Sequence, residues 1–75
     1  MRSFLGAVAR SLVDEPDGVR VLEKVEGTLV RLDLEVAAHD RGRVIGRSGR
    51  TAEALRTLLG VIARRRGLRC RLEIP

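Results

Sequence analysis

Aromatic side chains are almost absent from this 75-residue chain, which has no tryptophan, no tyrosine and a single phenylalanine, Phe4. Nucleic-acid-binding domains such as the RRM and the OB-fold stack bases on exposed aromatic rings. A chain without such rings offers no stacking platform. The composition therefore excludes these two modes of recognition.

Cysteine and histidine occur once each. Cys70 has no partner for an internal disulfide, which favours a reducing, cytoplasmic environment, and its alternation with apolar neighbours predicts a small buried residue. His39 has no second histidine or cysteine nearby, so we expect no metal site and a solvated loop position. No apolar run approaches the ~20 residues of a membrane span, and the apolar segment 4–9 is too short for a signal peptide.

Motifs of nucleotide-dependent enzymes are also missing. The chain contains no Gly-x-x-x-x-Gly-Lys-Ser/Thr loop and no Gly-x-Gly-x-x-Gly turn. No acid–base pair or activated nucleophile can be assembled from its motifs. We therefore expect neither enzymatic activity nor a cofactor.

Positive charge is abundant and unevenly distributed. Fourteen arginines and one lysine give a net charge of +5. Residues 1–40 carry a net charge of −3, whereas residues 41–75 carry +8. The basic second half indicates a polyanionic partner. The alternative is a general preference for arginine on solvated surfaces, which does not explain why the excess begins near a glycine-rich turn.

Hydrophobic periodicity predicts six elements in one domain that spans residues 1–75. Asp40 is expected to cap the second helix, Gly46 to end it, Ser48 or Gly49 to open the third helix, and Gly67 to end that one. The predicted helices are 2–13, 41–45 and 50–65, and the predicted strands are 19–26, 29–37 and 68–74.

This order, αββααβ, predicts an α+β fold. The first two strands form an antiparallel hairpin across Gly27-Thr28. A right-handed crossover through two helices places the last strand parallel to the second. The expected result is a mixed three-stranded sheet with its helices on one face.

The segment Gly46-Arg47-Ser48-Gly49 is the most informative motif. Two glycines let the backbone approach a ligand closely, because neither has a Cβ. Free N–H groups at the start of the following helix favour an anion. Arg47 and Ser48 supply a forked cation and a hydroxyl for phosphate oxygens. The alternative is a plain helix-to-helix turn.

Residues on either side extend this predicted site. Arg43 and Arg50 flank the loop with further positive charge. Val44 and Ile45 are expected to divide their roles: one packs in the core, and the other lines a shallow apolar groove for bases. Periodicity does not say which does which.

The stretch Val44-Ile45-Gly46-Arg47-Ser48-Gly49, followed by Thr51-Ala52 and Leu55, resembles the K-homology (KH) signature. The order αββααβ is similar to the bacterial type II version of that domain. The segments 11–17 and 49–59, together with the length, resemble the small bacterial KH proteins of the KhpA family. Lysine is common in relatives where Arg47 stands here; charge and hydrogen-bonding capacity are kept.

The resemblance implies single-stranded RNA binding through the loop and its flanks, including Thr51. It also implies a cytoplasmic regulator, described in the family as an RNA chaperone. A larger KhpB-like protein is the implied partner. Cell elongation, division and envelope homeostasis are the implied processes.

Two further features leave alternatives open. On helix 50–65, Ala54, Leu58 and Val61 form a second apolar stripe, which is either a homodimer or KhpB-like partner surface, or part of the core. Arg64-Arg65-Arg66 either complements a helix C-terminus or contacts RNA. Two other functions also compete: an adaptor whose partner makes most RNA contacts, and binding of single-stranded DNA.

Overall fold

The computed structural model describes all residues, 1–75. Its helices and strands follow the predicted order, and three short 3₁₀ turns lie at Pro16–Gly18, Ala38–Asp40 and Arg47–Gly49. The helices are α1 (Arg2–Leu12), α2 (Arg41–Ile45) and α3 (Arg50–Arg65), and the strands are β1 (Arg20–Glu26), β2 (Leu29–Glu35) and β3 (Arg69–Glu73).

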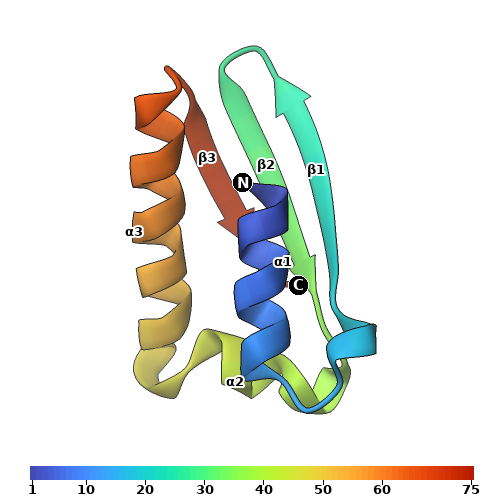
Figure 1. Cartoon of the computed structure of the whole chain (residues 1–75). Helices are drawn as coiled ribbons and strands as arrows, with labels where there is room; N and C mark the ends of the chain where they lie inside the picture. The colour runs from blue at the N-terminus through green and yellow to red at the C-terminus, as the bar shows by residue number, and fades with distance from the viewer.

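The sheet has the order β1-β2-β3, with β1 antiparallel and β3 parallel to the central β2. The helices α1 and α3 lie side by side on one face of the sheet, and α2 lies across one end (Figure 1). The predicted α+β fold with αββααβ order and a mixed sheet is thereby confirmed.

The core lies between the sheet and these helices. The central strand alternates regularly, so that Val30, Leu32 and Leu34 are buried while their neighbours are half-exposed. Period-two alternation is expected of a strand with one covered face. The other residues of this buried cluster come from α1, the residue before β1, α2, α3 and β3: Leu5, Ala9, Val19, Val44, Leu55, Leu59 and Leu72.

The predicted ends of several elements are wrong by one or two residues. The first helix stops at Leu12 because Val13 is already extended, at φ −101° and ψ 161°. The central strand ends at Glu35, two residues early, because the chain then turns into Ala38–Asp40. Such ends depend on local backbone geometry that hydrophobic spacing does not encode.

Cys70 is placed differently from prediction, and the structure decides one alternative that the sequence left open. Cys70 is half-buried rather than buried, and packs against the rim of the core. Burial, assisted by Glu23, raises the pKa of the Cys70 thiol above its ordinary value, which the N-terminal ammonium opposes. The second apolar stripe of α3 is not core, because Leu58 is 49% and Val61 37% exposed.

Candidate nucleic-acid interface

The glycine loop joins α2 to α3 at one end of the molecule (Figure 1). The helix α2 is terminated by Gly46, whose φ of 78° is a value that glycine adopts readily. The N–H of Gly46 donates to the carbonyl of Gly42 at 2.9 Å. The N–H of Gly49 then donates to the carbonyl of Gly46 at 3.1 Å. The loop is therefore one tight turn closed by its own backbone.

Two successive residues of the turn are left-handed. Ser48 has φ 56° and ψ 26°, and Gly49 has φ 74° and ψ 12°. Ser48 is the only non-glycine residue of the chain with a positive φ. This conformation costs an L-residue about 1–2 kcal/mol, and such strain is concentrated at functional sites.

Gly46 cannot be replaced without disturbing its neighbours. A Cβ built on Gly46 would lie 2.8 Å from the backbone nitrogen of Thr51, and would also strike the side chain of that residue. Thr51 is half-buried beneath the turn. At Gly49, by contrast, a Cβ would meet nothing within 4 Å. The first glycine thus permits close packing, and the second permits a left-handed backbone beside open space.

The polar side chains of the turn point into solvent. Arg47, Ser48 and Arg50 are exposed. No ion pair within 4.0 Å involves either arginine. The N-terminal turn of α3 adds the positive end of a 16-residue helix dipole beside them. The surface formed by the loop and the start of α3 therefore carries positive charge that no acidic side chain neutralises, and it is suited to bind an anion.

The structure decides which of Val44 and Ile45 packs in the core. Val44 is fully buried and belongs to the core. Ile45 is half-exposed next to the loop. Ile45 is therefore the apolar side chain available to a ligand at this corner.

Arg43 is tied to carboxylates instead of standing free. Its guanidinium lies 3.2 Å from Asp14 and 3.8 Å from Asp40. Asp14 lies in the loop after α1 and Asp40 directly precedes α2, so the positive charge of Arg43 is already partly neutralised within the fold. A phosphate at this position would have to compete with Asp14.

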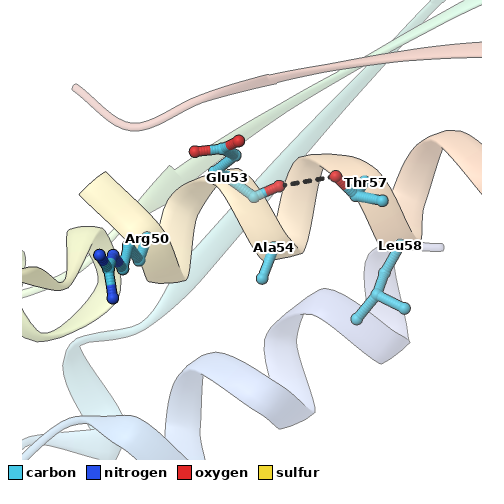
Figure 2. A pocket seen from close by; sticks show the side chains of 5 residues that line it. All are labelled: Arg50, Glu53, Ala54, Thr57 and Leu58. Atoms are coloured by element: carbon cyan, nitrogen blue, oxygen red, sulfur yellow. Dashed lines mark hydrogen bonds between the residues drawn. The ribbon is translucent and has the colours of Figure 1, made fainter. Parts of the chain in front are cut away.

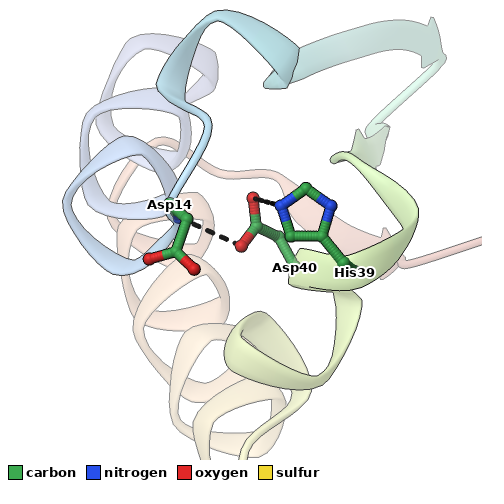
Figure 3. A group of neighbouring side chains, drawn as sticks. All are labelled: Asp14, His39 and Asp40. Carbon is green, nitrogen blue, oxygen red and sulfur yellow. Dashed lines mark hydrogen bonds and ion pairs between the residues drawn. The ribbon is translucent and has the colours of Figure 1, made fainter.

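Asp40 does not cap α2, contrary to the sequence-based expectation: its side chain makes no capping hydrogen bond. The carboxylate is instead fully buried and accepts the N–H group of Asp14 at 3.0 Å (Figure 3). It also accepts the N–H group of Glu15 at 3.0 Å. Burial alone would raise the pKa of Asp40. These two hydrogen bonds, with His39 and Arg43 nearby, hold it below its usual value of 3.8.

Asp40 is therefore a structural anchor between the loop after α1 and the start of α2, and through α2 it fixes the glycine loop. Sequence reasoning missed this role, because the bonded residues lie 25 and 26 positions away. Ligand atoms of Asp14, His39 and Asp40 lie within 4.8 Å of one another (Figure 3). The oxygens of Asp40 already accept N–H groups and Asp14 already pairs with Arg43, so this cluster is satisfied by protein groups.

A shallow groove of about 640 Å³ runs along the exposed side of α3 (Figure 2). Its lining residues are Arg50, Glu53, Ala54, Thr57 and Leu58. Ala54 and Leu58 point to the same side of the helix in Figure 2, toward the side on which α1 lies. The groove joins the cationic end of α3 to the exposed apolar stripe.

No helix is both long enough and apolar enough to cross a lipid bilayer.

Comparison with known proteins places the chain in a family. Residues 2–74 match the family model described as "KhpA/KhpB, KH domain". Proteins named RNA-binding protein KhpA are similar over nearly the whole chain. The one from Chlamydia pneumoniae is 45% identical over 75 residues, covering 99% of this chain and 95% of its own length.

Two further relatives carry the same name. The protein from Halalkalibacterium halodurans is 42% identical, covering 99% of this chain and 97% of its own length. The protein from Leifsonia xyli is 50% identical over 67 residues, covering 89% and 86%. No solved structure matches the chain significantly.

Proposed function

Because the chain belongs to the KhpA/KhpB KH-domain family, a family of RNA-binding domains rather than enzymes, we propose that it binds single-stranded RNA at its glycine loop. The observation that carries this proposal is the Gly46–Gly49 turn at the start of α3, with its left-handed Ser48–Gly49 backbone and two exposed arginines, Arg47 and Arg50, that pair with no acid. Residues 1–75 act as a single KH unit in this proposal.

The loop clamps the sugar-phosphate chain. Gly46 and Gly49 let the backbone approach the strand, while Arg47 binds a phosphate with its forked donors and Ser48 adds a hydroxyl. Arg50 and the first N–H groups of α3 bind the next phosphate. Thr51 supports the turn from below, and Arg43 contributes once a phosphate displaces Asp14.

Base recognition at this site relies on shape and hydrogen bonds. Ile45 supplies the apolar contact, because Val44 is buried in the core. Without aromatic rings there is no stacking contribution of ~1–3 kcal/mol per base. Binding is therefore weak, salt-sensitive and limited to about four nucleotides at the loop.

The test is Gly49→Asp, compared with Gly27→Asp as the matched control. Both glycines have a positive φ, of 74° and 60°, and a Cβ at either would meet nothing within 4 Å. The two substitutions thus carry similar backbone strain and the same charge. Binding is measured by fluorescence anisotropy with an oligouridylate of about four nucleotides. Gly49→Asp should bind roughly tenfold more weakly than wild type, whereas Gly27→Asp should bind like wild type.

Equal affinities of the two variants would mean that the loop is not the binding site. A parallel titration with the DNA oligomer of the same sequence separates an RNA-binding from a single-stranded-DNA-binding role. Only the RNA carries the 2′-hydroxyl by which a protein distinguishes the two.

The second candidate function is that of an adaptor, and the exposed stripe Ala54, Leu58 and Val61 favours it. Large apolar side chains left exposed together on one helix face are typical of an interaction surface. The partner is a second copy of this chain or a KhpB-like protein. In this case the partner makes most of the RNA contacts.

The physiological setting rests on family resemblance alone. In that setting the protein is a cytoplasmic RNA chaperone or post-transcriptional regulator. It acts with a KhpB-like partner in cell elongation, division and envelope homeostasis. Crosslinking and sequencing of bound RNA tests this setting, since unrelated transcripts would contradict it.

A further inference from the structure

Cations gather on the uncovered face of the sheet, at the end of the molecule far from the glycine loop. The register pairs Lys24 with Arg31, and Arg31 with Arg71, so three cations form one row across the three strands. Arg69 stands in the adjacent row, opposite Leu29. These side chains alternate with the buried residues of β2 and β3 and therefore point away from the helices.

The last turn of α3, on the helix-covered side of the sheet, lies at the same end of the molecule as this row (Figure 1). Its Arg64–Arg66 segment is exposed and has no acidic partner within 4.0 Å. The chain then turns directly into β3, where the N–H of Arg69 donates to the carbonyl of Thr28 in the hairpin turn at 2.8 Å. We call these seven residues the distal basic patch: Lys24, Arg31, Arg64–Arg66, Arg69 and Arg71.

Three carboxylates on the same face offset part of this charge: two of them pair with cations of the patch, and the third, Asp33, lies in the next row opposite Glu73. Glu26 lies 3.9 Å from Arg31, and Glu73 lies 2.9 Å from Arg71. Lys24 and Arg69 have no such partner. Like charges placed directly opposite each other on a sheet are destabilising, and the Nε of Arg31 is buried without a hydrogen-bond partner.

A purely structural explanation covers only part of the patch. Cations at the end of α3 interact favourably with the helix dipole, which accounts for Arg64–Arg66. The dipole does not reach Lys24, Arg31 or Arg71, which belong to the sheet. Arg31 and Arg71 each pair with one glutamate, whereas Lys24 and Arg69 pair with none and are open to an anion outside the fold.

We propose that the distal basic patch binds the phosphate backbone of a second RNA segment. The proposal rests on RNA binding at the loop and adds a second contact to it. The patch contains no aromatic residue, and the one large exposed apolar side chain beside it on this face is Leu22; a protein partner would use a cluster of such anchors, whereas backbone phosphates need only cations. An acidic protein is thus the less favoured ligand.

The two contacts are separated by the full length of α3. Sixteen residues at about 1.5 Å each span about 24 Å, and Figure 1 shows the hairpin turn and the end of α3 at the opposite end from α2. A four-nucleotide RNA held by the loop does not engage the patch. A longer RNA, or a second strand, does.

The test compares two triple variants that each remove three positive charges. The distal triple is Lys24→Gln, Arg69→Gln and Arg71→Gln, and the control triple is Arg2→Gln, Arg10→Gln and Arg20→Gln. All six residues are exposed. Each triple removes one arginine that faces a glutamate, Arg71 with Glu73 and Arg20 with Glu35.

With an oligouridylate of about four nucleotides, both triples should bind with equal affinity. With one longer than about 16 nucleotides, the distal triple should bind roughly tenfold more weakly than the control, and its slope of log K against log salt should be shallower by about 2. Equal affinity and slope of the two triples on the long RNA would overturn the proposal.

A second measurement keeps the two proposals distinct. Wild-type protein saturated with the short oligomer should still bind a labelled long RNA, and Gly49→Asp should retain this binding while losing the short oligomer. Loss of both by Gly49→Asp would refute the distal site, whereas unchanged short-oligomer binding by Gly49→Asp would refute the loop site. Binding of polyglutamate but not RNA to the patch would also overturn the proposal.

Discussion

Gly46 and Gly49 share a positive φ but differ in the space around them, and this difference predicts unequal tolerance of a methyl group. Gly49→Ala should cost about 1 kcal/mol, since only the left-handed backbone opposes the Cβ. Gly46→Ala should cost about 3 kcal/mol, because the Cβ also meets the backbone of Thr51. Urea unfolding measures both values, and equal costs would contradict the close packing at Gly46.

Asp40 predicts a specific dependence of stability on pH. Its pKa is lower in the folded state than its usual 3.8, through the N–H groups of Asp14 and Glu15 and in spite of burial. The unfolded state therefore binds more protons as the pH falls through and below 3.8. The stabilisation is complete above that value and is lost toward the folded-state pKa.

Asp40→Asn should consequently be less stable than wild type at neutral pH, because an amide cannot accept both N–H groups as a carboxylate does. The difference in unfolding free energy should shrink as the pH drops below 3.8. Chemical denaturation at several pH values measures it. A difference that stays constant with pH would show that the charge on Asp40 is unimportant.

At the scale of elements, α3 was the easiest to predict and the most informative. Its bounds, and those of α2, were predicted correctly. Glycines indicated the end of α2 and both ends of α3, whereas the start of α2 was assigned from Asp40, which does not cap it. The apolar pattern on α3 was visible in the sequence, which favoured a partner surface for the second stripe but left a core position open. Only the position of α3 at one side of the sheet decides that Leu59 is buried and Leu58 exposed.

The parts of the site that sequence could not supply all depend on contacts between distant elements. The Arg43–Asp14 pair joins α2 to the loop after α1. The burial of Val44 rather than Ile45 depends on how a five-residue helix is rotated against the core. The glycine loop itself was predictable because its chemistry is contained in four consecutive residues.

The exposed stripe of α3 predicts self-association or capture of a partner. Leu58→Asp should abolish any dimer seen by sedimentation at high micromolar concentration, because a charge would be buried at the contact. Leu22→Asp on β1 is the matched control, since Leu22 is 42% exposed against 49% for Leu58. A wild-type protein that remains monomeric at that concentration would contradict the homodimer.

For the whole molecule, the concentration of positive charge in residues 41–75 predicts that RNA affinity falls as the salt concentration rises. The short oligomer engages roughly three phosphates, so log K should fall with log salt at a slope of about −2. Isothermal titration at several ionic strengths measures this slope. A slope near zero would mean that base contacts, rather than the arginines of the loop, supply the affinity.

The parallel pairing of β2 with β3 also constrains how the protein folds. Leu29 and Arg69, which face each other across that pair, are forty positions apart in the chain. Closing a loop of that length must precede the contacts that stabilise it, which slows folding. During synthesis, the edge of β2 that pairs with β3 therefore stays unpaired until residues 69–73 have emerged from the ribosome. A nascent chain that stalls before β3 exposes that edge to neighbouring chains.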